Sequence, residues 1–290
     1  MRISFLGLGL IGGSIAGALR DGASGGIPVI AAWTPGGSGP REALAAGIID
    51  HAAASPEEAV AGADLVVLAA PPLACVELIV RLGGLWAGSL EPGATVTDVA
   101  STKAAVTAAA RAAGIPFAGG HPMAGRETSG FGAADPALFR DRPWVLTEAV
   151  GGGDREAVRR LALACGARPV DLGSERHDRL VASISHVPLL TSVALVEAVA
   201  GWGPDPAADW PDAAALAATG WRDTTRLARG DTTMGAEIAA SNAVAIVEVL
   251  RAYRERIDAL IAALDDPQGP DIAALRERLD VARDRLEGRR

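Results

Sequence analysis

The sequence has 290 residues, enough for two domains with a sizeable core, and 49% of them are hydrophobic. Its formal net charge is −8 without a long basic run, which argues against nucleic acid as a main partner. The two cysteines, Cys75 and Cys165, are far apart and have no metal-ligand spacing, so we expect no metal site, no disulfide framework and a cytoplasmic location. We also expect no signal peptide and no membrane partner, since breakers interrupt every apolar run of about eighteen residues.

The first residues predict a dinucleotide-binding unit. An apolar strand at 2–6 runs into a G-x-G-x-x-G motif, and a helix follows through 15–19. Gly7 permits a tight turn, Gly9 lets the backbone approach a pyrophosphate, and Gly12 lets the helix pack on the strand. An ordinary glycine-rich turn is the alternative, but the strand–helix context favours the nucleotide site. The cofactor-binding residues predicted here are Gly7, Gly9, Leu10, Ile11 and Gly12.

The end of the second strand, 29–33, bears on the choice of cofactor. Units that prefer NAD usually end this strand with Asp or Glu, which bonds the ribose 2′-hydroxyl. Here the position is Thr34, and Ser38 and Arg41 follow it. These residues favour NADP over NAD, because none repels a 2′-phosphate. The alternative is that Arg41 only begins a solvated helix.

Further strand–helix alternation predicts an α/β fold with a doubly wound parallel sheet over residues 1–172. Ser101 and Lys103 follow the strand at 95–99, where they could face the cofactor, and Ser101 could also be only a helix N-cap. The remaining expected elements are helices at 56–61, 72–82, 102–113 and 154–165 and strands at 65–69, 115–118, 144–146 and 168–171.

A histidine with glycines on both sides follows the short strand at 115–118. His121 is one of only four histidines, and Gly120 and Pro122 shape the backbone beside it. Because open α/β sheets place their chemistry just beyond strand ends, a loop at this position predicts a catalytic histidine. The alternative is a turn whose histidine only caps local backbone.

Residues 173–290 predict an all-helical domain. A helix over 174–200 contains Pro188 as a break or kink, and a loop follows at 201–211. Helices over 234–264 and from Ile272 to Leu286 each bear a narrow apolar stripe. These stripes fit either packing within the chain or a homodimer interface.

Several motifs, in this order, resemble the prephenate/arogenate dehydrogenase family over nearly the whole chain. The resemblance implies a Rossmann domain, a helical dimerisation domain and the NAD(P)-dependent oxidative decarboxylation of a small cyclohexadienyl acid. The motifs are Gly7–Ser14, Asp98–Lys103, Gly120–Gly125 with Glu127–Gly130, His177-Asp178, Ser185–Pro188 and Arg222–Arg226.

The resemblance also implies roles for single residues. His121 matches the histidine that polarises the ring hydroxyl, and Ser101 matches the serine that supports it beside the nicotinamide. A neutral imidazole, with a reference pKa of about 6.5, suits proton transfer near neutral pH. Arg226 matches an arginine that binds a substrate carboxylate, for which a planar guanidinium is well suited. Glu127, Asp223 and His186 complete the predicted substrate-binding residues.

Two positions depart from the family's pattern and leave prephenate and arogenate both open as substrates. Leu189 stands where the family often has a second histidine, and Gly235 where it often has an aromatic residue. His177 and His186 could shape the pocket floor or only join helices. The length leaves no room for a fused mutase or a regulatory domain, so we expect no built-in tyrosine sensor.

Two other functions compete with this hypothesis. A β-hydroxyacid dehydrogenase-like or imine reductase-like enzyme would share the Rossmann unit, but a catalytic lysine would be expected on the helical tail, and the tail has none. A non-catalytic NAD(P)-binding redox sensor would need no proton acceptor, so Ser101, His121 and Arg226 together favour an enzyme.

Overall fold

A computed structural model describes residues 1–22, 28–126, 128–203 and 205–288. The chain divides into two compact units, Met1–Ala243 and Val244–Arg290. The first unit contains the sheet together with helices from both halves of the sequence. The expected domains, 1–172 and 173–290, therefore stay a prediction.

The sheet has eight strands in the order β3-β2-β1-β4-β5-β6-β7-β8. The order reverses beside β1, so a crevice for a ligand is expected at the carboxyl ends of β1 and β4. The doubly wound sheet is confirmed with one difference, because β7 runs antiparallel to β6 and all other pairs are parallel. The strands are β1 (Arg2–Leu6), β2 (Val29–Trp33), β3 (His51–Ala52), β4 (Leu65–Leu68), β5 (Thr95–Asp98), β6 (Phe117–Pro122), β7 (Pro143–Val150) and β8 (Arg168–Asp171).

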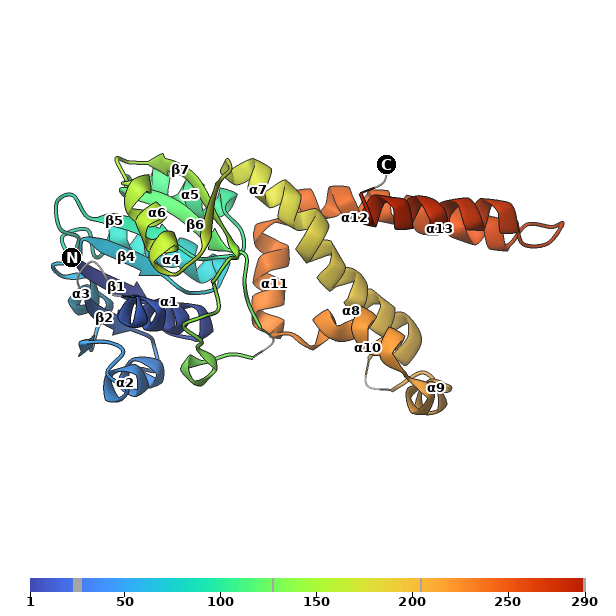
Figure 1. Cartoon of the computed structure of the whole chain (residues 1–290), viewed down its shortest axis with the longest axis horizontal. Coiled ribbons are helices and arrows are strands. Elements are labelled where there is room, and N and C mark those ends of the chain that lie inside the picture. The colour runs from blue at the N-terminus through green and yellow to red at the C-terminus, as the bar shows by residue number, and fades with distance from the viewer. Residues whose placement is uncertain (23–27, 127, 204, 289–290) are drawn as a thin grey trace. The chain divides into compact units, whose positions relative to one another are not determined.

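Helices cover both faces of the sheet, as Figure 1 shows. Along β4, Leu65 and Val67 face the core beneath α1 and α6, whereas Val66 and Leu68 face the core beneath α3, α4 and α5. Burial on both faces explains why this strand is apolar throughout rather than alternating. The helices of this part are α1 (Leu10–Asp21), α2 (Ser38–Ala45), α3 (Pro56–Val60), α4 (Pro72–Gly83), α5 (Ala104–Ala112), η1 (Phe131–Ala133) and α6 (Arg155–Ala164).

The helix expected over 174–200 is continuous. Pro188 does not break it, because a π-helical turn precedes α8 and places the proline in that helix's first turn. The helix is long and apolar enough to cross a membrane, but a single such helix is weak evidence, so the absence of a membrane partner stays a prediction. The helices from here to the end of the unit are α7 (Ser174–Val181), η2 (Ala182–His186), α8 (Val187–Ala200), α9 (Trp210–Leu216), α10 (Thr219–Thr225), η3 (Arg226–Arg229) and α11 (Thr232–Ser241).

The expected single helix over 234–264 is wrong. Asn242, with φ −124°, leaves the helical conformation and separates α11 from α12 (Ala243–Leu264). Its side-chain amide bonds the Asp178 carbonyl at 2.8 Å and the His186 ring at 3.1 Å, so tertiary contacts accompany the break. In the second unit, α13 (Ile272–Leu286) follows α12 after a turn, and Leu279 and Leu286 of its apolar stripe are exposed.

Candidate active site

The glycines after β1 form a cradle that fits a dinucleotide. Gly7 has φ +105°, and a Cβ there would lie 2.2 Å from the Ala69 carbonyl oxygen. A Cβ on Gly12 would lie 2.6 Å from the Gly7 oxygen, so both positions require glycine for packing. A Cβ on Gly9 would meet nothing within 4 Å, and no side chain caps the first N–H groups of α1 beside it. The open space at Gly9, next to the helix start with Leu10 and Ile11, is suited to a pyrophosphate.

This contrast gives a sharp prediction for Gly9→Ala. The variant should fold normally, because the added methyl group points into open space. It should weaken binding of the dinucleotide by about tenfold or more, since a steric conflict with a phosphate readily costs about 1.4 kcal/mol. Cofactor titration by fluorescence measures the loss, with Gly88→Ala, an exposed glycine after α4 whose added methyl group would also meet nothing within 4 Å, as the matched control. Equal affinities for the two variants would contradict the cradle.

The turn after β2 holds both residues predicted to select the cofactor. Thr34 Oγ1 accepts a hydrogen bond from Gly37 N at 3.1 Å, and Arg41 donates to the Gly36 carbonyl at 3.2 Å. The Arg41 guanidinium therefore lies over this turn while remaining exposed. A cation stands at the strand end where a ribose 2′ substituent is expected.

His121 lies within β6, so the predicted loop is wrong at this residue. The strand continues to Pro122 because it pairs with β7, where His121 stands opposite Val145. The two glycines before His121 allow β6 to pack closely against its neighbours. A Cβ on Gly119 would lie 2.5 Å from Thr147 Oγ1, and a Cβ on Gly120 would lie 2.8 Å from Trp144 Nε1. The histidine thus sits on a rigid strand at its carboxyl end.

The ring of His121 is the partly buried first member of a hydrogen-bonded chain. Its Nδ1 lies 2.8 Å from His177 Nε2, and His177 Nδ1 lies 2.7 Å from Asp178 Oδ1. The Asp178 carboxylate also accepts the backbone N–H groups of Lys103 at 2.8 Å and Ala104 at 2.9 Å. Burial lowers the pKa of His121 well below 6.5, and His177, Lys103 and His186 lower it further. His121 is therefore neutral near pH 7, as a proton acceptor must be.

Lys103 does not face the cofactor, contrary to the prediction. It is fully buried, its ammonium group pairs with Asp98, and it donates to the Gly120 carbonyl at 2.7 Å. Burial raises the pKa of Asp98, whereas Lys103 and the N–H groups of Ala100 and Gly120 oppose that rise. This buried ion pair ties the end of β5 to the residue that precedes His121.

Ser101 follows β5 and is partly exposed. It is not the N-cap of α5, since Lys103 occupies that position. In the part of the chain that the structure describes, no hydrogen bond joins Ser101 to His121, whose Nδ1 is bonded by His177 instead. The role of Ser101 beside the nicotinamide stays a prediction.

The predicted substrate-binding residues are spread over the helical part of the first unit. His186 ends η2, and burial lowers its pKa to about 4. Asp223 and Arg226 are exposed on α10 and η3, which pack against α8. Glu127 lies outside the described residues. The side-chain amide of Asn242 is bonded to the His186 ring and also donates to the backbone carbonyl of Asp178.

The two departures from the family's pattern meet in space. Leu189 of α8 places its Cδ2 3.6 Å from where a Cβ of Gly235 on α11 would stand. The leucine side chain therefore lies against the position where an aromatic ring is often found. Sequence spacing alone gives no sign that these two positions are neighbours.

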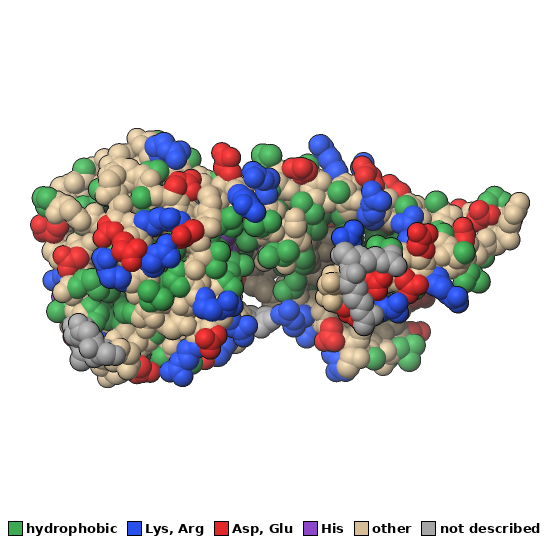
Figure 2. Space-filling model, turned by 45° about the horizontal axis from the view of Figure 1, so that its top comes forward, with side chains coloured by type: hydrophobic (Ala, Val, Ile, Leu, Met, Phe, Trp, Pro, Cys, Tyr) green, Lys and Arg blue, Asp and Glu red, His purple; other side chains and the backbone are tan. Residues whose placement is uncertain are grey.

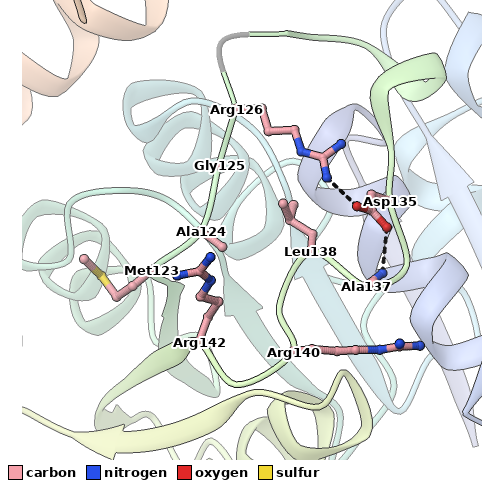
Figure 3. A pocket seen from close by; sticks show the side chains of 9 residues that line it. All are labelled: Met123, Ala124, Gly125, Arg126, Asp135, Ala137, Leu138, Arg140 and Arg142. Atoms are coloured by element: carbon pink, nitrogen blue, oxygen red, sulfur yellow. Dashed lines mark hydrogen bonds and ion pairs between the residues drawn. The ribbon is translucent and has the colours of Figure 1, made fainter. Parts of the chain in front are cut away.

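A cavity of about 440 Å³ lies beyond the end of β6 (Figure 3). Arg126 and Asp135, which form an ion pair, line it together with Arg140 and Arg142. None of the described residues predicted for the site lines it, so we do not assign it to the substrate. Figure 2 shows a hollow near the middle of this face, with hydrophobic side chains beside it.

The doubly wound sheet, the open glycine cradle and the histidine at the end of β6 define a dinucleotide-binding oxidoreductase. Residues 37–170 match the nucleotide-binding domain of prephenate dehydrogenase, and residues 173–278 match its dimerization domain. The chain therefore belongs to the prephenate dehydrogenase family.

Individual relatives agree with this assignment. Prephenate dehydrogenase of Lactococcus lactis subsp. cremoris is 32% identical over 269 residues, which cover 89% of this chain and 69% of the relative. Prephenate dehydrogenase of Bacillus subtilis is 32% identical over 270 residues, covering 88% and 68%. The crystal structure of Synechocystis arogenate dehydrogenase is 31% identical with a TM-score of 0.78, covering 99% of this chain and 100% of that one.

Two features of the site were not found in the sequence. The hydrogen bond between His121 and His177 joins residues 56 positions apart, although the adjacent pair His177-Asp178 stood out as a motif. The buried role of Lys103 had one available signal, since it is the only lysine in a chain that otherwise uses arginine.

Proposed function

We propose that the protein catalyses the NAD(P)-dependent oxidative decarboxylation of prephenate, to 4-hydroxyphenylpyruvate, or of arogenate, to tyrosine. The observation that supports it most is a neutral, partly buried histidine at the carboxyl end of β6, bonded to His177 and through it to Asp178, in a chain of this family. Relatives named prephenate dehydrogenase and arogenate dehydrogenase align over most of the chain.

The residues of this chain have distinct tasks in the reaction. When bound, NAD(P) supplies the hydride acceptor at the carbinol carbon. His121 takes the hydroxyl proton, and we place Ser101 beside the nicotinamide. We assign Arg226 to a substrate carboxylate and propose Glu127, Asp223 and His186 as further substrate-binding residues. Loss of carbon dioxide makes the ring aromatic and the step irreversible.

Arg226→Ala should raise the substrate KM by about 10- to 100-fold with little change in kcat, because a hydrogen bond to a charged group contributes about 1.5–3 kcal/mol. Steady-state kinetics with saturating cofactor measures this. Arg229→Ala, an exposed arginine in the same short helix, is the matched control and should leave KM unchanged. A change confined to cofactor affinity would contradict the carboxylate role.

For the cofactor we propose a preference for NADP over NAD. Thr34 and Arg41 support it, since the strand end has a cation over its turn and no acidic side chain. Thr34→Asp should move the ratio of kcat/KM towards NAD by about tenfold, the effect of about 1.4 kcal/mol of repulsion on a 2′-phosphate. Thr34→Asn is the uncharged control of the same shape. If both variants keep the wild-type ratio, the strand end does not face the ribose.

We further propose a cytoplasmic homodimer that pairs through its C-terminal helices. Residues 173–278 match a dimerization domain, and the apolar stripe of α13 is exposed within a single copy, with Leu279 72% and Leu286 90% exposed. Both cysteines are free and buried, in accord with a reducing compartment. The partners proposed are a small-molecule substrate and a second copy, with no nucleic acid and no membrane.

A four-way initial-rate assay tests the proposed function. Prephenate or arogenate is combined with NAD or NADP, and the absorbance of reduced nicotinamide is followed. We expect activity with at least one combination, and the fastest identifies both the substrate side chain and the cofactor. Silence in all four, with the cofactor still bound, would contradict the function and favour the redox-sensor alternative.

A further inference from the structure

Two buried residues behind His121 have no task in the mechanism above. His177 and Asp178 are adjacent on α7, with 1% and 4% of their surfaces exposed. Helix α7 packs on α5 and β7, which brings the pair to the back of the His121 ring. Buried polar side chains are costly unless they are bonded, and both of these are bonded on several atoms.

The hydrogen bonds determine which nitrogen of each ring bears its proton. The two oxygens of Asp178 accept N–H groups from Lys103 and Ala104 at the start of α5, so this side chain acts as a carboxylate acceptor. His177 donates from Nδ1 to Asp178, and in that tautomer its Nε2 is an acceptor. His121 consequently donates from Nδ1 to His177, which leaves a lone pair on its Nε2.

That nitrogen is the one available to a substrate. Among the residues that the structure describes, no side chain is hydrogen-bonded to Nε2 of His121. Positive charge formed on this ring would lie near the Lys103 ammonium group and His186, which both disfavour it. Asp178, held as an anion one ring away, supplies the opposing charge.

We propose that Asp178, acting through His177, positions His121 in the tautomer with a bare Nε2 and stabilises the imidazolium that forms there. The proposal rests on the proposed function, because it assumes that His121 accepts the substrate's hydroxyl proton. In that step the O–H bond breaks and an Nε2–H bond forms, while the electron pair of the adjacent C–H bond leaves as hydride to the nicotinamide. His177 and Asp178 touch no reacting atom and are positioning residues.

Asp178→Asn removes the anionic charge but keeps the direction of these hydrogen bonds. The Asn oxygen can stay on the Lys103 N–H and His177 Nδ1, which share Oδ1 of Asp178, so His121 keeps its tautomer while its imidazolium loses the opposing charge. We expect turnover to fall by about 10²-fold. Glu175→Gln, an exposed carboxylate on the same helix, is the matched control and should leave turnover unchanged.

His177→Gln tests whether turnover depends on the tautomer of His121 or only on the packing of the His177 ring. A glutamine can accept from His121 Nδ1 and donate to Asp178, so it preserves the direction of both bonds. This variant should retain turnover within about tenfold of wild type. If instead it is as damaging as Asp178→Asn in a protein that unfolds at the wild-type temperature, the tautomer is not what matters.

Nitrogen NMR of the free protein reads the tautomer without any substrate. The chain has four histidines, so single replacements assign every ring. We expect Nε2 of His121 to be unprotonated in the wild type, in His177→Gln and in Asp178→Asn. A proton on Nε2 of His121 in the wild type, or unchanged turnover in Asp178→Asn, would overturn the proposal. An inactive wild type with the expected tautomers would instead contradict the proposed function alone.

Discussion

Replacing His121 with asparagine is expected to lower turnover by about 10²–10⁴-fold, which is the contribution typical of a positioned general base. Asparagine can still bond the substrate hydroxyl, but its amide cannot take up a proton. The effect should appear in kcat and in kcat/KM alike, because the interaction is made only in the transition state. Cofactor affinity should stay as in the wild type, because the glycine cradle after β1 is built from other residues.

Stopped-flow measurement of the first turnover distinguishes this loss from slow product release. His51→Asn makes the same chemical change at an exposed histidine that pairs with Glu58, and it should behave as the wild type. Unchanged turnover in His121→Asn would remove this residue from the mechanism and leave the fold intact.

Lys103→Met is expected to lower the free energy of unfolding by about 3–5 kcal/mol, because it leaves Asp98 buried without its partner. Both side chains are 0% exposed, so water cannot replace the lost ammonium group. The variant should also regain stability as the pH falls. Burial raises the pKa of Asp98, and without Lys103 the folded state takes up a proton that the unfolded chain releases, so acid favours folding.

Urea unfolding at pH 8 and at pH 5 measures both effects. Arg160→Met removes the cation from the exposed pair with Asp154 and serves as the control, with little change expected at either pH. A loss for Lys103→Met as small as for this control would show that the buried pair contributes nothing to stability.

The fold was predictable from the sequence because the apolar strands, the glycine motif and the alternation of strands and helices all indicated the same α/β fold. The continuous apolar run at 65–69 predicted a buried strand, observed at Leu65–Leu68, and the motif at Gly7 predicted the first turn. The errors arose where tertiary contacts override local signals. Gly119 and Gly120 suggested a loop but allow β6 to pack against β7, and Asn242 ends a helix that its periodicity would have continued.

The site was predictable only in part. The motifs identified His121, but what surrounds it depends on contacts between residues far apart in the chain. The hydrogen bond to His177 and the contact of Leu189 with Gly235 both require α7, α8 and α11 to be placed against their neighbours. The local sequence pattern does not predict which distant residues meet in the fold. His177 and Asp178 are adjacent in the sequence, so the sequence could identify them as a pair.

The most direct test of the central claim is the ratio of carbon dioxide released to nicotinamide reduced. It is measured with the wild-type enzyme and whichever of prephenate and arogenate is turned over. Oxidative decarboxylation predicts one molecule of carbon dioxide for each NAD(P)H, together with an aromatic product. Reduction of the cofactor without carbon dioxide would mean a simple alcohol dehydrogenase and would contradict the proposed reaction.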